Sequence, residues 1–367
     1  MKIKIDRSEL LPTLTLVSSV VEKRQTLPIL ANLYFGVEDK KMTLVGTDLE
    51  VEISESIEGV QGDNGNFTVS TRKILDISRM LPDNASISLK SDGEKVVVTS
   101  GRSRYTLKTL PADEFPRIET GNWEERFKIN HLFLKRLLEK TSFAMAVQDV
   151  RYYLNGVLFE IGQNRIRAIA TDGHRLAQSE EEINLSIDDI RQVIVPRKAV
   201  SEIARFLDSD QEVDILIEVS KNHLRLSRND TTLITKLIDG KFPEFKGVLD
   251  TELNIVVPVN RSELIDTLTR AAVLTTDRFK GVKLTLKDGT LSVTANNPEQ
   301  EEALEEMGVE YKGDSIETGY NVAYLIDAAR VISGEKVELH FQGNDGICIL
   351  KQPGDDVSTW LVMPMRI

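Results

Sequence analysis

The stretch Thr171-Asp172-Gly173-His174-Arg175-Leu176 follows the strand-like sequence Arg-Ile-Arg-Ala-Ile-Ala at residues 165–170 and has two counterparts elsewhere in the chain. These counterparts lie at residues 46–52 and 294–299, so that Asp48, Asp172 and Asn296 stand 124 residues apart in each step. A fixed spacing of this kind indicates repeated structural units. The sequence therefore predicts a chain built from three related parts.

Two helix starts recur with nearly the same period. Good N-cap residues open a first helix in each part, at Asp6, Asn130 and Asn260. A second helix begins near Arg72, Arg197 and Val322, which are 125 residues apart in each step. We therefore expect three domains of one architecture, over residues 1–124, 125–252 and 253–367.

Short strands with tight turns make up the rest of each part. Residues 95–99 and 165–169 are rich in Val and Ile, and Ser91-Asp92-Gly93 and Lys287-Asp288-Gly289 are typical hairpin turns. Hairpins imply antiparallel pairing, and each part also holds two amphipathic helices. The predicted class is α+β, with two helices against antiparallel sheet in each of three repeated domains.

The charge of the chain is unevenly distributed. Among its 367 residues, 46 basic and 58 acidic side chains give a net charge of −12, which by itself argues against binding a polyanion through bulk charge. The third part alone contributes −7 of this total. The helices carry the opposite sign, with basic residues at 72, 73 and 79, at 135, 136 and 140, and at 197, 198 and 205. A basic surface on an acidic body would suit a phosphate backbone.

Residues that would support catalysis or metal binding are scarce. Cys348 is the single cysteine, the four histidines are scattered, and no glycine-rich phosphate loop or nucleophile elbow occurs. Asp172 and His174 form the best acid–base candidate, although Asp-Gly is also a turn signal. We expect no catalytic residue, no metal site and no cofactor. The alternating N-terminus and the lack of a run of about 20 apolar residues predict a cytoplasmic protein without a membrane segment.

Two further patches point to binding. The C-terminal stretch Trp360-Leu361-Val362-Met363-Pro364-Met365-Arg366-Ile367 is apolar to its last residue, and Pro364 should take the tail out of the sheet. Methionines beside it would line an adaptable apolar groove. Arg102 and Arg104 flank Ser103 on an expected strand in the first part, and an acidic cluster at residues 299–306 lies in the third. Opposite charges at the two ends of one chain suit head-to-tail association into a ring.

In their order and spacing, these features resemble the bacterial β sliding clamp family, the processivity subunits of DNA polymerase III. The resemblance spans residues 1–367 and includes residues 26–30, 148–156, 171–176, 296–301 and the terminal Met-Pro-Met-Arg. It implies three clamp domains per chain and two chains head to tail in a ring. Antiparallel sheets would lie outside and two helices per domain would line a channel around duplex DNA.

The resemblance also assigns three sets of residues. The DNA-contacting set comprises Arg24, Arg72, Gln148, Tyr152 and Tyr153. The groove that takes partner peptides comprises Thr171, Gly173, His174, Arg175, Leu176, Pro243, Val248, Val362, Met363, Pro364, Met365 and Arg366. The dimer interface comprises Arg102, Arg104, Tyr105, Val273, Leu274, Glu299, Glu301, Glu302 and Glu305. Gly247 stands where well-known members carry arginine, and Ile367 replaces a terminal leucine.

The resemblance implies a non-catalytic homodimeric ring that encircles duplex DNA independently of sequence and tethers the replicative polymerase. Implied partners are the polymerase III catalytic subunit, the clamp loader, other polymerases and repair proteins, which insert a short Gln- and Leu/Phe-containing peptide. Two other functions stay open from the residues alone. One is a hydrolase using Asp172 and His174, and the other is a peptide-binding scaffold that never touches DNA.

Overall fold

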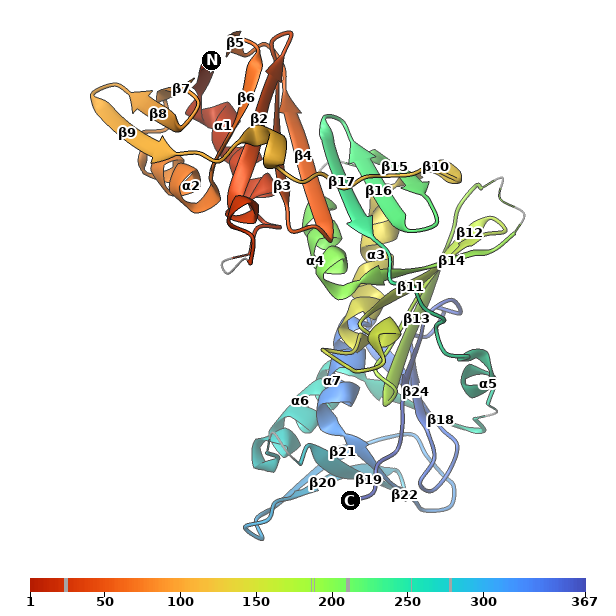
Figure 1. The fold of residues 1–367 in the computed structure, drawn as a ribbon. Helices are drawn as coiled ribbons and strands as arrows, with labels where there is room; N and C mark the ends of the chain where they lie inside the picture. Colours follow the sequence, from red (N-terminus) through yellow and green to blue (C-terminus); the bar gives the residue numbers. More distant parts are fainter. Residues whose placement is uncertain (23–25, 186, 188, 209–211, 252, 277–278) are drawn as a thin grey trace. The chain divides into compact units, whose positions relative to one another are not determined.

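The computed structural model describes residues 1–367 except 23–25, 186, 188, 209–211, 252 and 277–278 (Figure 1). The chain divides into two compact units, one formed by Met1–Leu134 with Lys198–Leu237 and the other by Lys135–Arg197 with Ile238–Ile367. Each unit holds one sheet from a single repeat and one eight-stranded sheet that joins strands of two consecutive repeats.

The three repeats share one order of main elements, which is strand, helix, four strands, helix and three strands, and they differ in short added elements. The first repeat contains β1 (Lys2–Asp6), α1 (Arg7–Val17), the 3-10 turn η1 (Pro28–Ala31), β2 (Asn32–Glu38), β3 (Lys41–Thr47), β4 (Val51–Ile57), β5 (Gln61–Gly62), β6 (Gly65–Ser70), α2 (Thr71–Met80), β7 (Ser86–Ser91), β8 (Lys95–Ser100), β9 (Ser103–Lys108) and η2 (Ala112–Glu114). The second contains β10 (Glu125–Asn130), α3 (His131–Thr141), η3 (Ser142–Ala144), η4 (Tyr152–Leu154), β11 (Gly156–Gly162), β12 (Arg165–Thr171), β13 (Arg175–Glu182), β14 (Arg191–Pro196), α4 (Arg197–Phe206), β15 (Asp214–Val219), β16 (His223–Arg228), β17 (Thr231–Lys236) and α5 (Lys246–Leu249). The third contains β18 (Ile255–Asn260), α6 (Arg261–Ala271), η5 (Ala272–Leu274), β19 (Gly281–Lys287), β20 (Thr290–Asn296), β21 (Glu302–Gly308), β22 (Ile316–Asn321), α7 (Val322–Val331), β23 (Lys336–Phe341), β24 (Cys348–Lys351) and β25 (Thr359–Val362).

Consecutive repeats share a continuous sheet within each unit. In the first unit, β17 of the second repeat pairs with β4 of the first, in the order β10-β15-β16-β17-β4-β3-β2-β6. In the second unit, β25 pairs with β13, in the order β14-β11-β12-β13-β25-β24-β23-β18. The remaining sheets are β5-β1-β7-β8-β9 and β21-β20-β19-β22. Every named strand pair in the described residues is antiparallel, which confirms the predicted α+β class of three repeated domains.

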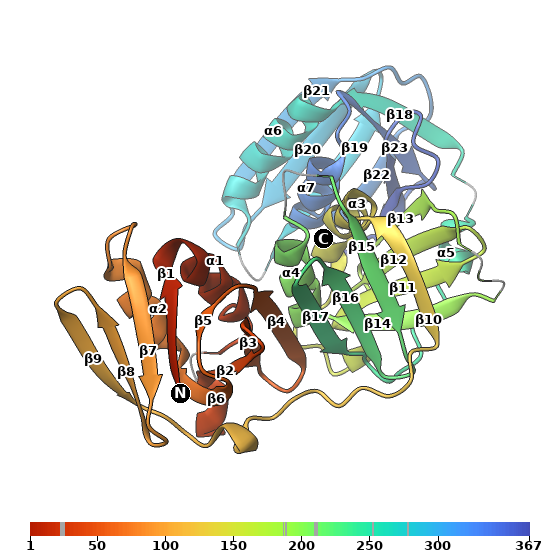
Figure 2. The ribbon, with the colours of Figure 1, turned by 90° about the horizontal axis from the view of Figure 1, so that it is seen from above.

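The predicted helix starts are confirmed in all three repeats. The side chain of Asn260 accepts a hydrogen bond from the Glu263 backbone N–H, as an N-cap should, and α7 begins after Asn321 in the same way. Helical spacing places Leu264, Leu268 and Ala271 of α6 in the core. Figure 2 shows α6 and α7 lying along the sheet of β19 and β20. Leu11 of α1 is half-buried, and Ala272 follows α6 as the first residue of η5.

Arginines at equivalent positions tie the two helices of a repeat together. Arg7 opens α1 and donates from Nε to the Ser78 carbonyl oxygen of α2 at 2.8 Å. Arg261 opens α6 and donates to the carbonyl oxygens of Ala329 and Arg330 of α7 at 2.9 and 3.0 Å. Each guanidinium therefore satisfies carbonyls in the last turn of the second helix and opposes the negative end of its dipole.

We expect Arg261→Ala to lower the free energy of unfolding by about 1–2 kcal/mol, because it leaves these carbonyls without their charged donor. Urea unfolding followed by circular dichroism measures the change. Lys312→Ala is the control, since Lys312 is exposed in a loop of the same repeat. An equal loss of stability in both variants would contradict the role of Arg261 as a helix cap.

Candidate functional site

The turn that decides the repeat pattern is built on two polar side chains. Thr171 Oγ1 donates to the Arg175 carbonyl oxygen at 2.6 Å and accepts from the Gly173 N–H at 3.0 Å. Asp172 Oδ1 accepts from the N–H groups of His174 and Arg175. Gly173 has a φ of +89°, a conformation that favours glycine. The turn between β12 and β13 is therefore rigid and leaves the His174 side chain exposed.

The first repeat forms the same turn with Thr47 and Asp48. Thr47 Oγ1 donates to the Val51 carbonyl oxygen, and Asp48 Oδ1 accepts from the N–H groups of Glu50 and Val51. The shared hydrogen bonds explain why Thr-Asp recurs after 124 residues. The local differences after Asp172 are therefore features of the second repeat and not requirements of the turn.

Arg175 anchors the turn from the inside. Its guanidinium donates to Asp172 Oδ2, Asp327 Oδ2 and the Phe143 carbonyl oxygen, and it lies 4.3 Å from the centroid of the Tyr324 ring. The side chain is only 12% exposed, so it positions the turn against α7 instead of projecting into solvent. Arg175 belongs to the predicted peptide groove, and this geometry gives it a positioning role there.

An apolar cluster lies beneath the turn in the second unit. Its buried members are Ala146, Leu154, Leu158, Ile169, Leu176, Ile194, Phe242, Phe245, Ile347, Ile349 and Leu361. Around it, Val248 of α5 is 40% exposed and Pro243 is exposed, and Val362 ends β25 in the core. The structure thus brings the predicted groove residues Leu176, Pro243, Val248 and Val362 to one region of the second unit.

The C-terminal tail leaves the sheet after Val362, as its proline predicts. The Met363 N–H donates to the His174 carbonyl oxygen at 2.8 Å, and the Met365 N–H donates to the Gly319 carbonyl oxygen at 2.9 Å. These two bonds tie the tail to the β12–β13 turn and to the edge of β22. Both methionine side chains are 38% exposed, so the tail displays flexible apolar groups beside the cluster.

The loop before β11 holds most of the predicted DNA contacts. Asp149 and Asn155 close it, because the Asp149 N–H donates to Asn155 Oδ1 and Asn155 Nδ2 donates to the Asp149 carbonyl oxygen. Arg151 pairs with Asp149, and these hydrogen bonds lower the pKa of Asp149 to about 2. The pair therefore stays ionised at physiological pH and holds the loop closed.

The side chains on this loop face different surroundings. Gln148 is exposed and Tyr152 is 56% exposed, whereas Tyr153 packs against the apolar cluster. The rings of Tyr152 and Tyr153 meet edge to face, with centroids 5.8 Å apart. Arg151 Nη2 also donates to the Asp172 carbonyl oxygen, which connects the loop with the turn. The two predicted sites are therefore adjacent within the second unit.

Several basic side chains on the helices already form ion pairs or hydrogen bonds within the chain, which the sequence does not show. Lys140 pairs with Asp355, Lys198 pairs with Glu22 and Asp48, and Arg136 forms two bonds to Glu181. Arg197 donates to the Met145 and Ala146 carbonyl oxygens. Arg72 is different, since its side chain is 91% exposed and lies 3.7 Å from Asp76. The helices therefore display a weaker positive field than a count of their basic residues predicts, because internal carboxylates neutralise several of them. Arg24 lies outside the described residues.

The predicted dimer residues lie on or near the last strands of two sheets and in the 3-10 turn η5. Arg104 and Tyr105 are exposed on β9, the last strand of its sheet, whereas Arg102 lies in the β8–β9 turn and not on the strand where we expected it. Val273 in η5 is 77% exposed and Leu274 is half-buried. The acidic residues lie on and before β21, the last strand of the other sheet. Of these, Glu305 already pairs with Arg270, and Glu301 accepts from Asn297.

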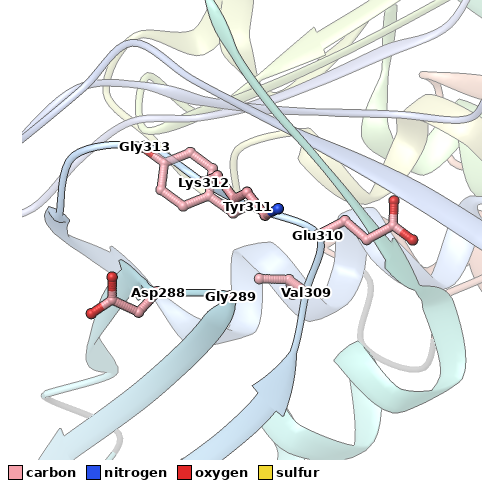
Figure 3. Close-up of a pocket in the computed structure, with 7 residues that line it drawn as sticks. All are labelled: Asp288, Gly289, Val309, Glu310, Tyr311, Lys312 and Gly313. Atoms are coloured by element: carbon pink, nitrogen blue, oxygen red, sulfur yellow. The ribbon is translucent and has the colours of Figure 1, made fainter.

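No group of three His, Cys, Asp or Glu residues in the described chain could hold a metal ion. The Asp172 carboxylate accepts from backbone N–H groups and from Arg175, so its bonds shape a turn. A separate hollow is lined by Asp288, Gly289 and residues 309–313 (Figure 3). There the Asp288 and Glu310 carboxylates point away from each other, so they do not form an acid–base pair. No helix within the described ranges is long and apolar enough to span a membrane.

Sequence reasoning missed four residues that hold this region together. Tyr324 and Asp327 of α7 contact the Arg175 guanidinium, and Arg151 connects the loop before β11 with the β12–β13 turn. The Gly319 carbonyl oxygen accepts a hydrogen bond from the C-terminal tail. The spacing of Tyr324 and Asp327 places them on one helix face, but the sequence does not reveal what that face meets. A Cβ on Gly319 would lie 2.4 Å from the Met365 carbonyl oxygen, a close approach that only the fold reveals.

Comparison with known proteins identifies the family. Models of the N-terminal, central and C-terminal domains of the DNA polymerase III beta subunit match residues 1–119, 128–244 and 246–366. Beta sliding clamps of Pseudomonas putida and Escherichia coli are 44% and 40% identical, each over 100% of both chains. The crystal structure of the DNA polymerase III subunit beta from Pseudomonas aeruginosa has a TM-score of 0.97 and 42% identity, again over both full chains. The chain belongs to the DNA polymerase III beta subunit family, the β sliding clamps, and is a non-catalytic DNA sliding clamp.

Proposed function

We propose that this chain performs the clamp function as a head-to-tail homodimer that encircles duplex DNA and tethers its partners through one peptide-binding groove per chain. The observation that carries the clamp function is the agreement of the whole chain with sliding clamps in sequence and fold. The polymerase III catalytic subunit, the clamp loader, other polymerases and repair proteins would be the partners, acting in the cytoplasm without a membrane.

The proposed DNA contacts come from two places that differ in chemistry. Arg72 offers an almost fully exposed guanidinium for phosphate. Gln148 and Tyr152 stand on a loop that internal hydrogen bonds keep rigid, and an exposed tyrosine ring can stack on an unpaired base. Neither contact reads base edges in a groove, so binding would not depend on sequence. Tyr153 would act by supporting the Tyr152 ring.

Internal ion pairs favour sliding over tight binding. Lys140 and Lys198 are neutralised by carboxylates of this chain, which leaves fewer cations to hold phosphates. Since DNA affinity and its salt dependence rise with the number of phosphates neutralised, few contacts give weak and exchangeable binding. Topological linkage would then supply the long residence that the electrostatic contacts do not.

The proposed groove combines the rigid turn with the flexible tail. His174, Leu176 and Val248 would form one wall, and Met363 and Met365 would form the other. Methionine side chains adapt to different partners, which suits a site that takes Leu or Phe side chains from several proteins. The tail hydrogen bonds to His174 and Gly319 would set the width of this groove.

The proposed dimer joins the two open sheet edges of different copies. Exposed Arg104 on β9 and exposed Glu302 on β21 have opposite charges, and Tyr105, Val273 and Leu274 offer apolar area between them. A contact between two different surfaces is heterologous, and it closes into a ring when the rotation permits.

Retention on circular DNA tests the clamp function directly. We expect a clamp loader to place the protein on nicked circular DNA, where it should stay through gel filtration and leave once the DNA is linearised. Arg72→Ala combined with Tyr152→Ala should reduce loading by about tenfold, because both the phosphate contact and the stacking contact are lost. Lys312→Ala, in an exposed loop, is the matched control.

Retention on linear DNA, or saturable binding to one duplex sequence, would contradict the proposal. Unchanged loading after neutralisation of both Arg24 and Arg72 would favour a scaffold that does not contact DNA. An enzymatic activity lost in His174→Ala would instead favour the hydrolase.

A further inference from the structure

One residue pair has the same register in all three repeats. One member of the pair lies on the first strand after the first helix, and the other lies opposite it on the strand that precedes the second helix. The pairs are Tyr34–Thr68, Leu158–Ile194 and Lys283–Gly319. The chain segment that follows the last strand of each repeat forms hydrogen bonds with the second member of the pair. Leu110 exchanges hydrogen bonds with Thr68 Oγ1, Ile238 donates to the Ile194 carbonyl oxygen, and Met365 donates to the Gly319 carbonyl oxygen. Leu110, Ile238 and Met365 are therefore equivalent.

Repeats one and two fill the space beside this pair with a phenylalanine from their own chain. Phe115, five residues after Leu110, packs on the Tyr34 ring with centroids 5.6 Å apart and is 6% exposed. Phe242, four residues after Ile238, is 8% exposed in the cluster that contains Leu158 and Ile194. Both phenylalanines precede a proline and stand within two residues of a glutamate, in Glu114-Phe115-Pro116 and Phe242-Pro243-Glu244.

The third repeat holds an open pocket at the same place. Its lining includes Lys283, Ser315, Glu317, Gly319, Arg366 and Ile367, around a volume of about 740 Å³. None of these described lining residues is aromatic, and Lys283 stands where the other repeats have Tyr34 and Leu158. Ile367 lies over Gly281 and Gly319, where a Cβ would come within 3.3 Å and 2.7 Å of it, and so forms one end of the pocket.

We propose that this pocket docks a Phe-Pro segment with an adjacent acidic residue, supplied by a partner protein. Repeats one and two indicate which ligand would fit the pocket. In each of them a phenylalanine followed by proline packs beside the equivalent pair of residues. Lys283 is 46% exposed and lies 3.7 Å from Glu317 of the pocket lining, so a glutamate beside the aromatic ring would compete with Glu317 for Lys283 and could also meet the exposed Arg366. The pocket volume lies in the range of sites that bind small ligands and side chains.

The pocket adjoins the proposed peptide groove without being part of it. Met365 and Arg366 belong to both, whereas Lys283, Ser315 and Glu317 line only the pocket. A partner whose peptide fills the groove could therefore place a second segment here and gain affinity through a linked contact. Occupancy of the pocket does not depend on DNA or on the clamp ring.

The chain itself supplies the probe, a labelled Gly-Lys-Phe-Pro-Glu-Phe peptide corresponding to residues 240–245. We expect saturable binding by fluorescence anisotropy, with the δ1 methyl resonance of Ile367 shifting on titration. Replacing the first phenylalanine of the peptide by alanine should weaken binding by about tenfold or more, because the ring is the main buried group. Ser315→Trp should do the same by filling the mouth of the pocket.

The controls distinguish binding in this pocket from non-specific apolar binding and from binding in the proposed peptide groove. Lys312→Trp adds the same ring three residues away, outside the pocket lining, and should leave the affinity unchanged. Lys283→Glu should weaken binding of the probe and favour a peptide in which the glutamate is replaced by lysine. Equal binding by the Ser315→Trp and Lys312→Trp proteins, or no saturable binding by the unaltered protein, would overturn the proposal. A groove-binding peptide that still binds Ser315→Trp would show that the groove stands independently.

Discussion

We expect deletion of residues 363–367 to abolish binding of a Gln- and Leu/Phe-containing partner peptide, a loss of about a hundredfold or more, while the proposed dimer persists. The deletion removes Met363 and Met365, the two exposed apolar side chains of the tail. It also removes the hydrogen bonds to His174 and Gly319 that place these side chains beside the apolar cluster. The peptide would lose one complete wall of its groove.

The fold should survive this deletion. β25 (Thr359–Val362) remains paired with β13 and β24, and Trp360 keeps its position in the core, where its indole N–H donates to the Lys140 carbonyl oxygen. Equal thermal melting curves for the two proteins would document this. Calorimetric titration with the peptide measures affinity, and sedimentation measures the dimer. An unchanged peptide affinity would show that the groove lies elsewhere.

Val273→Glu should raise the dissociation constant of the proposed dimer by about a hundredfold or more, because it would bury a carboxylate in an apolar contact. Val273 is 77% exposed in η5, so the substitution costs the isolated chain little. In the proposed dimer it would face the apolar surface that includes Tyr105 of the other copy. Its negative charge would also lie in the third repeat, the most acidic part of the chain.

Sedimentation velocity over a dilution series measures this change. Val357→Glu is the matched control, since Val357 is 43% exposed in a turn outside the predicted interface. We expect the control protein to remain dimeric at concentrations where the Val273→Glu protein is monomeric. A dimer of unaltered stability in both proteins would exclude the η5 surface as an interface.

The sequence by itself determined the repeated architecture. Thr47-Asp48 and Thr171-Asp172 form the same hydrogen-bonded turn, and the side chains of Asn130 and Asn260 accept hydrogen bonds at the starts of α3 and α6, because these effects act over a few neighbouring residues. The departure of the tail after Val362 is local in the same way, since Pro364 lacks the N–H that a strand needs. The family resemblance added the candidate residues, which no local rule supplies.

Only the tertiary structure decided which of these side chains are available to bind DNA or partner proteins. The sequence shows Lys140, Arg175 and Lys198 as cations, but Asp355, Asp327 and Asp48 neutralise them from positions 150 to 215 residues away. The open pocket beside Lys283 likewise appears only when the three repeats are compared in space. Contacts between residues distant in the chain depend on how the sheets and helices pack, and local sequence does not encode their partners.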